Sequence, residues 1–187
     1  MQIVLASASP RRHELLAAAG FSFTVHAPNI EEIIVPGVRP TDAARELACQ
    51  KAEAVAELYP EACVIAADTI VVIDGEILGK PADEADAVHM LQQLSGREHT
   101  VNTGVCIITG STDGLQRISY TDETQVRFYA LSEDEIARYV ATGEPMDKAG
   151  AYGIQGRGAV LVQGIVGNFY NVMGLPVSAI RHLREFA

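Results

Sequence analysis

The sequence has no tryptophan, few aromatic residues and only three cysteines in 187 residues. Cys49, Cys63 and Cys106 are odd in number and far apart along the chain. This spacing predicts neither a disulfide framework nor a pair of metal ligands. We therefore expect three small, mostly buried, reduced thiols.

Long apolar runs are also missing. No stretch approaches the roughly 20 uninterrupted apolar residues that a membrane-spanning helix requires. The opening residues, MQIVLASASPRR, place their charges after a short apolar run, which is the reverse of a secretory signal. We expect a cytoplasmic protein that does not associate with membranes.

Basic residues are scarce: 14 stand against 24 acidic residues, for a formal net charge of −10. Nucleic-acid binding normally needs a basic face or stripe, so a stable complex with nucleic acid is not expected. Any anionic ligand must instead meet a local group of cations. The length, with 48% apolar residues, suits one globular domain over residues 1–187.

Several well-known catalytic motifs do not occur. The chain has no Gly-x-x-x-x-Gly-Lys-Ser/Thr phosphate loop and no Gly-x-Ser-x-Gly nucleophile elbow. Its histidines show no zinc-ligand spacing. His99 could orient a loop or occupy a half-buried position in a strand, and we favour the position in a strand.

The apolar pattern predicts an α/β fold. Runs at 2–7 and 63–67 indicate strands that are covered on both faces. A helix is expected to begin at Pro10 and a longer one at Thr41 or Asp42. The result is a mixed twisted sheet flanked by helices, in which polar loops that follow strands are the usual place for a ligand.

Three local signals refine the second half of the chain. Asp74-Gly75 is a strong hairpin signal, and Ser132 with Glu135 forms a capping box at the start of a helix. Residues 143–158 contain five glycines and fit no regular element, so we expect an ordered loop there.

Arg11 and Arg12 fall in the first turn of the first predicted helix. Free backbone N–H groups, the positive end of the helix dipole and two guanidinium groups would converge at this point. The pair is therefore a candidate phosphate site. Two solvated surface arginines are the alternative.

Three lysines are further candidates. Lys51 lies on the long helix, and Lys80 stands between Gly79 and Pro81, which restrict the backbone around it. Each could be a phosphate ligand or a solvated charge. For Lys148 the simpler interpretation is a surface ion pair with a neighbouring acid.

Asp68 is the most informative acidic residue, because it directly follows a buried run and precedes Thr69. A lone carboxylate at the end of a buried strand is costly without partners. It would be either a functional group or a cap for nearby backbone N–H groups. Glu31 and Glu32 could offer carboxylates to Mg²⁺ or Mn²⁺, or simply be solvated.

Taken together, the motifs resemble those of the Maf family of nucleoside triphosphate pyrophosphatases. They occur in the family's order and cover nearly the whole chain. The matching segments are Ser7-Ala8-Ser9-Pro10-Arg11-Arg12, Ala67-Asp68-Thr69-Ile70-Val71, Gly79-Lys80-Pro81, Ser95-Gly96 to Thr103-Gly104, Gly143-Glu144-Pro145 to Gly156, and Asn171 to Pro176.

The resemblance implies a fold like that of the inosine triphosphate pyrophosphatases (Maf/Ham1), a divalent metal, and cleavage between the α and β phosphates. Asp68 matches the proposed general base, and with Glu32 it would be a metal ligand. Arg12, Lys51 and Lys80 match positions that engage the triphosphate. A homodimer is also implied.

Three positions separate branches of this family. Arg11, Thr69 and Gln155 match the branch that cleaves dTTP and UTP, whereas a branch acting on 7-methyl-GTP has an aromatic residue, Gln and Glu there. The Gln155 amide offers both a donor and an acceptor, which suits the imide edge of uracil or thymine. The alternative for Gln155 is a role in bracing the glycine-rich loop. Tyr152 and Phe169 could stack on the base, although core positions are more common for aromatic residues.

We therefore expect hydrolysis of dTTP, UTP and modified pyrimidine triphosphates to the monophosphate and pyrophosphate. The main alternative is a nucleotide-sensing regulator, linked to cell division, that binds the same ligands without turnover. Asp68→Asn would distinguish the two.

Overall fold

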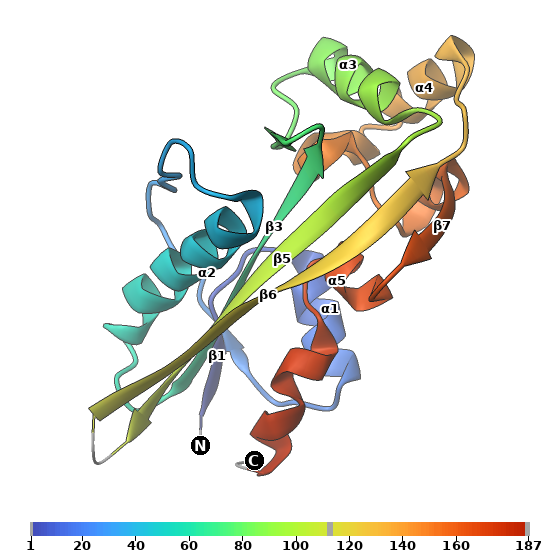
Figure 1. The fold of residues 1–187 in the computed structure, drawn as a ribbon. Helices are drawn as coiled ribbons and strands as arrows, with labels where there is room; N and C mark the ends of the chain where they lie inside the picture. Colours follow the sequence, from blue (N-terminus) through green and yellow to red (C-terminus); the bar gives the residue numbers. More distant parts are fainter. Residues whose placement is uncertain (1, 112–113, 186–187) are drawn as a thin grey trace. The chain divides into compact units, whose positions relative to one another are not determined.

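The computed structural model describes residues 2–111 and 114–185. Their strands form one seven-stranded mixed sheet in the order β2-β1-β3-β5-β6-β7, with β4 paired to β3 (Figure 1). Strand β1 runs parallel to β2 and β3, whereas the β3–β4 and β6–β7 pairs are antiparallel. The predicted α/β architecture, a mixed sheet flanked by helices, is confirmed. The strands are β1 (Ile3–Leu5), β2 (Thr24–Val25), β3 (Cys63–Ile73), β4 (Glu76–Leu78), β5 (Glu98–Ser111), β6 (Gly114–Phe128) and β7 (Val162–Val166).

Five α-helices and four 3-10 segments complete the described residues. The α-helices are α1 (Pro10–Ala18), α2 (Pro40–Ala56), α3 (Glu84–Leu94), α4 (Glu133–Val140) and α5 (Phe169–Met173). The 3-10 segments are η1 (Glu144–Asp147), η2 (Ala149–Ala151), η3 (Gly156–Leu161) and η4 (Val177–Glu185). None of the helices in the described ranges is long and apolar enough to cross a bilayer.

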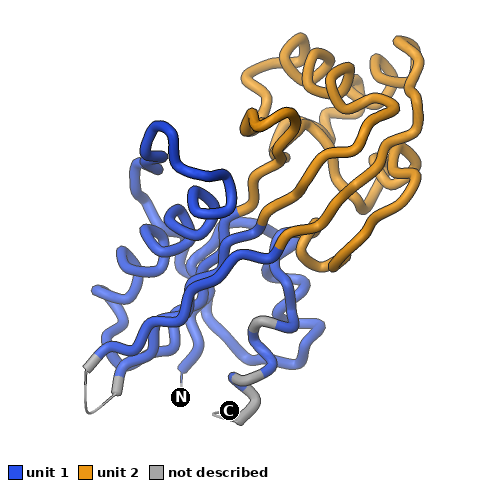
Figure 2. The backbone as a smooth tube through the Cα atoms, in the orientation of Figure 1, with its two compact units in different colours: residues 1–68, 103–122, 174–187 blue, residues 69–102, 123–173 orange. Residues whose placement is uncertain are grey.

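The chain divides into two compact units, each assembled from separate stretches of sequence (Figure 2). Unit 1 contains residues 1–68, 103–122 and 174–187, and unit 2 contains residues 69–102 and 123–173. Strands β3, β5 and β6 each have residues in both units.

The core of unit 1 forms between the sheet and α2. Apolar residues of α2 pack on β1, β3 and β5, and Figure 1 shows α1 on the opposite face of these strands. Residues of β1 and the first half of β3 are buried without interruption, because helices cover both faces. The α2 side of this core contains Val4, Ala6, Ala48, Ala52, Val55, Ala56, Ala62, Val64, Ala66, Cys106 and Ile108.

Unit 2 has its own core. Helices α3 and α4 and the segment from 149 to 161 pack against β3, β4, β5 and β6. The Asp83 side chain caps α3 by accepting from the Asp86 N–H, and the predicted Ser132–Glu135 capping box opens α4.

Several predicted boundaries change in the structure. Helix α2 begins at Pro40, before the predicted Thr41 or Asp42, since proline is favoured in the first turn. The run at 63–67 does not end at Asp68, because β3 continues without a break to Ile73. The strand-end position predicted for Asp68 is therefore wrong. Part of the turn expected between β5 and β6 lies outside the described residues.

Candidate functional site

Lys51, Asp68 and Glu32 form an ion-pair cluster in unit 1. The Lys51 ammonium, on α2, donates to Asp68 Oδ1 on β3 and lies 2.8 Å from Glu32 Oε1. Lys51 and Asp68 are only 9% and 8% exposed, whereas the Glu32 side chain is half exposed. Lys51 is thus a neutralising partner that allows a carboxylate to stand in the middle of a buried strand.

Arg12 joins this cluster from the first turn of α1. Its Nε donates to the Gly174 carbonyl over 2.8 Å, and one terminal nitrogen donates to Ser7 Oγ over 3.3 Å. Burial lowers the Arg12 pKa, and the negative charge of Asp68 acts in the opposite direction. Arg12 therefore sits within electrostatic reach of Asp68, and its guanidinium orientation is fixed from two sides.

The local sequence explains this placement of Arg12. The chain leaves buried β1 at Leu5, and Ser7 then accepts from the Ser9 N–H over 3.1 Å before Pro10 begins α1. The same Ser7 oxygen also accepts a hydrogen bond from the Arg12 guanidinium. Sequence reasoning did not single out Ser7 as a site residue, although Ser7 begins the matching segment that leads into this helix. Arg11 is partly exposed, and its charge further lowers the pKa of Arg12.

The remaining predicted site residues, Thr69, Lys80 and Gln155, belong to unit 2. Thr69 is partly buried, and Lys80 and Gln155 are exposed. The Gly150 N–H donates to the Gly79 carbonyl over 3.0 Å, so the Lys80 turn is bonded to the glycine-rich segment that contains Gln155.

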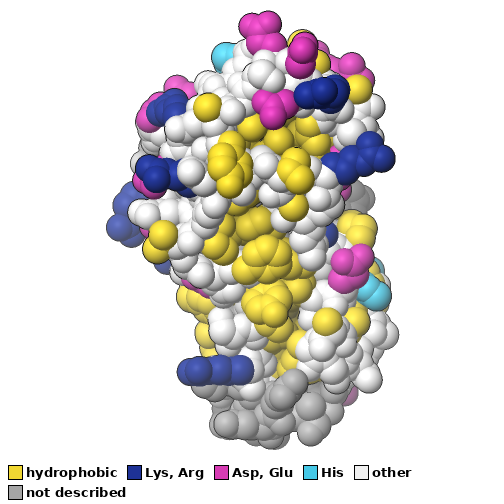
Figure 3. Space-filling view, turned by 90° about the vertical axis from the view of Figure 1, so that its right-hand side faces the viewer, with side chains coloured by type: hydrophobic (Ala, Val, Ile, Leu, Met, Phe, Trp, Pro, Cys, Tyr) yellow, Lys and Arg dark blue, Asp and Glu magenta, His cyan; other side chains and the backbone are white. Residues whose placement is uncertain are grey.

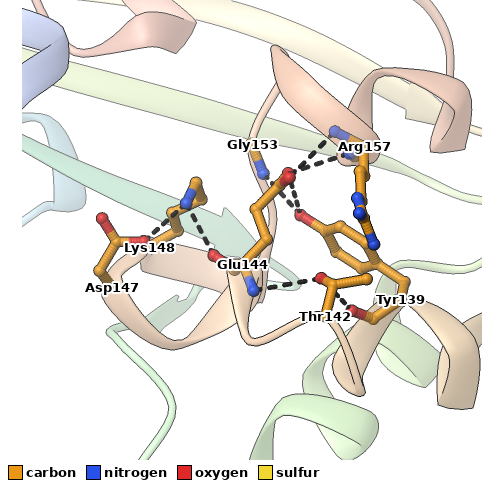
Figure 4. Close-up of polar contacts among 8 residues, drawn as sticks. Tyr139, Thr142, Glu144, Asp147, Lys148, Gly153 and Arg157 are labelled. Atoms are coloured by element: carbon orange, nitrogen blue, oxygen red, sulfur yellow. Dashed lines mark hydrogen bonds and ion pairs between the residues drawn. The ribbon is translucent and has the colours of Figure 1, made fainter.

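The glycine-rich segment is held by the Glu144 carboxylate (Figure 4). Glu144 accepts hydrogen bonds from the backbone N–H groups of Arg157 and Gly158, each at 3.0 Å, and from the Tyr139 hydroxyl at 3.0 Å. The predicted ordered loop is therefore confirmed, with short 3-10 turns inside it. At Gly156, with φ of 69°, a Cβ atom would come within 2.8 Å of Glu144 Oε2.

The electrostatics of Glu144 follow from these bonds. Burial by itself would raise the Glu144 pKa, but the two backbone N–H donors and Tyr139 outweigh that effect and hold the pKa below its ordinary value. Sequence reasoning missed this role of Glu144. Lys148 pairs with Asp147 at 2.6 Å and bonds the Glu144 carbonyl at 2.7 Å, which confirms the predicted local ion pair.

His99 is more deeply buried than predicted, at 4% exposure on β5. Its Nε2 lies 2.8 Å from the Tyr152 hydroxyl, and its ring packs edge-on against Phe128 and Tyr152. Tyr152 is itself a core residue, so base stacking by Tyr152 is not favoured. Burial lowers the pKa of His99 to about 4.

This burial of His99 predicts a loss of stability in mild acid. The unfolded chain takes up a proton near pH 6.5, whereas folded His99 resists protonation down to about pH 4. The free energy of unfolding should therefore fall as pH drops through this window, by about 3 kcal/mol in total. Urea unfolding at pH 7.5 and pH 5 should show a smaller loss for His99→Gln than for the wild type.

His13→Gln provides the control, because His13 is exposed on α1. It should lose as much stability between the two pH values as the wild type. An equal loss in the His99→Gln protein would rule out His99 as the source of the acid sensitivity.

Glu32 and Asp68 are the candidate metal ligands. Both carboxylates contact the same Lys51 ammonium, so each reaches one common point in unit 1. Carboxylate oxygens suit Mg²⁺ or Mn²⁺, and Mg²⁺ is commonly held by one or two carboxylates together with substrate phosphates. The donor set therefore fits a hard divalent cation. Within the described ranges, no group of three or more His, Cys, Asp and Glu side chains gathers around a common point.

The arrangement gathers charged groups of opposite sign in unit 1. Arg12 and Lys51 are two cations close to the Asp68 carboxylate. On an α/β sheet, such a cluster is typical of proteins that bind and cleave phosphate-bearing ligands.

Comparisons with known proteins identify the family of this chain. The model of the family described as "Maf-like protein" matches residues 2–186, and the chain belongs to that family. It is 53% identical over 186 residues to a dTTP/UTP pyrophosphatase of Symbiobacterium thermophilum, covering 99% of this chain and 94% of the relative. It is 47% identical over 186 residues to a dTTP/UTP pyrophosphatase of Bacillus pumilus, covering 99% and 96%. Among solved structures, it is similar to the Staphylococcus aureus Ham1 protein, with a TM-score of 0.48 and 18% identity over 68% of this chain and 72% of the other.

Proposed function

We propose that this chain hydrolyses dTTP and UTP to the nucleoside monophosphate and pyrophosphate. The observation that carries the proposal is the cluster in which Asp68, buried in the middle of β3, meets the cations Lys51 and Arg12. Relatives about 50% identical over nearly the full chain carry the name of this activity, which supports the choice of substrate.

The phosphate groups would be bound by cations. Lys51 and Arg12 neutralise triphosphate oxygens, and the guanidinium is already oriented by Ser7 and the Gly174 carbonyl. Preorganised cations stabilise the charge that develops on the pyrophosphate leaving group. Lys80 is a further proposed phosphate ligand.

Asp68 is the proposed general base. When phosphate oxygens compete for the Lys51 ammonium, Asp68 loses part of its ion pair and can accept a proton from water. That water attacks the α phosphorus. The bond from the α phosphorus to the oxygen that bridges it to the β phosphorus then breaks, and pyrophosphate leaves.

Glu32 and Asp68 would hold Mg²⁺ or Mn²⁺. When bound, the cation supplies charge neutralisation at the phosphate oxygens.

For selection of the base, we propose Arg11, Thr69 and Gln155. The Gln155 amide can pair with the imide edge shared by uracil and thymine. Gln155 is exposed, while the backbone just after it is fixed by Glu144. The side-chain amide of Gln155 is therefore accessible to a ligand, while the neighbouring backbone is held in place.

The test is an assay of the purified protein against dTTP, UTP, dCTP, dATP, dGTP and 7-methyl-GTP, with Mg²⁺ or Mn²⁺ and with product separation. The expected products are dTMP or UMP with pyrophosphate. The rates of hydrolysis of dTTP and UTP should be much higher than those of the purine nucleotides. Diphosphate with orthophosphate would refute the proposed reaction. A preference for 7-methyl-GTP would refute the proposed base selection.

We also propose a homodimer that uses the face of unit 2 around β7. Strand β7 ends the strand order, and Figure 3 shows hydrophobic side chains gathered on this side of the molecule. Val160 and Val166 are 76% and 72% exposed, and Phe169 and Tyr170 are also exposed. Covering this apolar surface is favourable.

Sedimentation velocity tests the proposed dimer. Val166→Glu should shift the protein from dimer to monomer, because it places a charge in the apolar interface. Leu58→Glu is the control, since Leu58 is 61% exposed and lies in unit 1. A monomeric wild type, or a Val166→Glu protein that stays dimeric, would contradict the proposal.

The proposed substrates are metabolites of the cytoplasm, and we place the protein there. Stable binding of nucleic acid is not part of the proposal, given the net charge of −10.

A further inference from the structure

Helix α2 and strand β5 lie side by side in unit 1 with very close backbones. A Cβ atom added at Gly104 of β5 would lie 2.1 Å from the Ala44 carbonyl oxygen in α2. One added at Gly110 would lie 2.2 Å from the Pro60 carbonyl oxygen, just beyond the helix. The two segments therefore run in the same direction, and only glycine allows this approach.

This alignment places two cysteines opposite each other. Cys49 follows Ala44 by five residues, which is about 7.5 Å along a helix. Cys106 follows Gly104 by two residues, which is about 6.6 Å along a strand. The two residues therefore advance by nearly equal distances from a shared contact point.

The side chains meet as this alignment requires. Cys49 packs against the core cluster that contains Cys106. The two thiols are near enough for each to shift the pKa of the other. All three cysteines of the chain are free thiols, as predicted. Because Cys49 and Cys106 are far apart along the sequence, the spacing alone did not predict that they are neighbours in space.

The two thiols differ in environment. Cys49 is partly exposed, and its pKa is lowered by the neighbouring Cys106 thiol, against the opposite effect of burial and with smaller effects from Ser119 and Arg117. Cys106 is fully buried, and its pKa is raised. Cys63 is an internal comparison, because it is fully buried and its pKa is raised to about 11 by burial alone. A partly exposed thiol beside a fully buried one is the arrangement of an attacking and a resolving cysteine.

We propose that Cys49 and Cys106 form a dithiol site that peroxides oxidise to an intramolecular disulfide. The Cys49 thiolate attacks one peroxide oxygen, the O–O bond breaks, and Cys49 becomes a sulfenic acid. The hydroxide that leaves takes up the proton that Cys49 released on ionising and becomes water. The Cys106 sulfur then attacks the Cys49 sulfur, and the S–S bond forms as hydroxide leaves and takes up the Cys106 proton. In total, two thiols lose two electrons and two protons, and hydrogen peroxide becomes two waters.

The experiment uses the full chain and hydrogen peroxide, and N-ethylmaleimide is then added in denaturing urea so that the buried thiols also react. After brief oxidation, the wild type should take up one maleimide instead of three and should yield a Cys49–Cys106 linked peptide by non-reducing mass spectrometry. Dithiothreitol should restore uptake of three. None of these readouts depends on nucleotide hydrolysis.

Variants separate the roles of the three cysteines. Cys63→Ala should form the same linked peptide at the wild-type rate. Cys49→Ser should form no disulfide, and Cys106→Ala should accumulate a Cys49 sulfenic acid that dimedone traps. The proposal is overturned if the wild type forms only higher Cys49 oxides, links separate chains, or leaves Cys49 as unreactive as Cys63.

Discussion

Replacing Asp68 by asparagine is expected to lower kcat for dTTP hydrolysis by about a thousandfold, within the range that general-base catalysis contributes. Asparagine has nearly the same shape, and its amide oxygen can still accept from Lys51, but it cannot take a proton from water. The Kd for dTTP should change only a few fold. Pyrophosphate release gives kcat, and calorimetry on the inactive variant gives Kd.

Asp74→Asn is the matched control for this change. Asp74 pairs with Arg97 on the surface of unit 2, and its φ of 52° is a conformation that asparagine tolerates. It should keep wild-type kcat. If Asp68→Asn also keeps wild-type kcat, Asp68 is not the base. If the wild type binds dTTP with no turnover at all, the regulator alternative is correct.

Replacing Lys51 by methionine should damage both activity and stability. The change leaves Asp68 buried beside Glu32 without the ammonium that both contact. Breaking a buried ion pair on one side typically costs about 3–5 kcal/mol. We expect a loss of this order in the free energy of unfolding, and a fall in kcat/KM for dTTP of about a hundredfold or more because a phosphate ligand is lost.

Two further variants check the Lys51 argument by urea unfolding. Arg117→Met removes an exposed ion pair with Glu53, a residue of α2 like Lys51. It should lower the free energy of unfolding by at most about 1 kcal/mol. Lys51→Met combined with Asp68→Asn should be more stable than Lys51→Met alone, since it leaves no buried carboxylate unpaired. A double variant as unstable as the sum of its single changes would contradict this explanation.

The local part of the fold could be predicted from sequence because it depends on neighbouring residues. Pro10 begins α1, and Ser132 with Glu135 caps α4, as their spacing predicted. The apolar runs at 2–7 and 63–67 correctly indicated strands covered on both faces.

The position of Asp68 could not be predicted in the same way. Aspartate is disfavoured inside strands, so the sequence suggested that the strand ended there. The strand continues because Lys51, from a helix 17 residues earlier, neutralises the carboxylate. That contact depends on how α2 packs on the sheet, which local patterns do not encode.

The candidate site was predicted by residue type more fully than by arrangement. The sequence singled out Arg12, Lys51, Asp68 and Glu32, and the structure gathers these four in unit 1. It gave no reason to pair Lys51 with both carboxylates. Such pairings are tertiary contacts, set by the side of the sheet on which each element packs.

The claim at the centre of this account is that water attacks the α phosphorus beside Asp68. Hydrolysis of dTTP in ¹⁸O-labelled water, followed by mass spectrometry of both products, tests it most directly. The account predicts that a single turnover places the label in dTMP and leaves the pyrophosphate unlabelled. Label in the pyrophosphate, with unlabelled dTMP, would show attack at the β phosphorus and contradict the account.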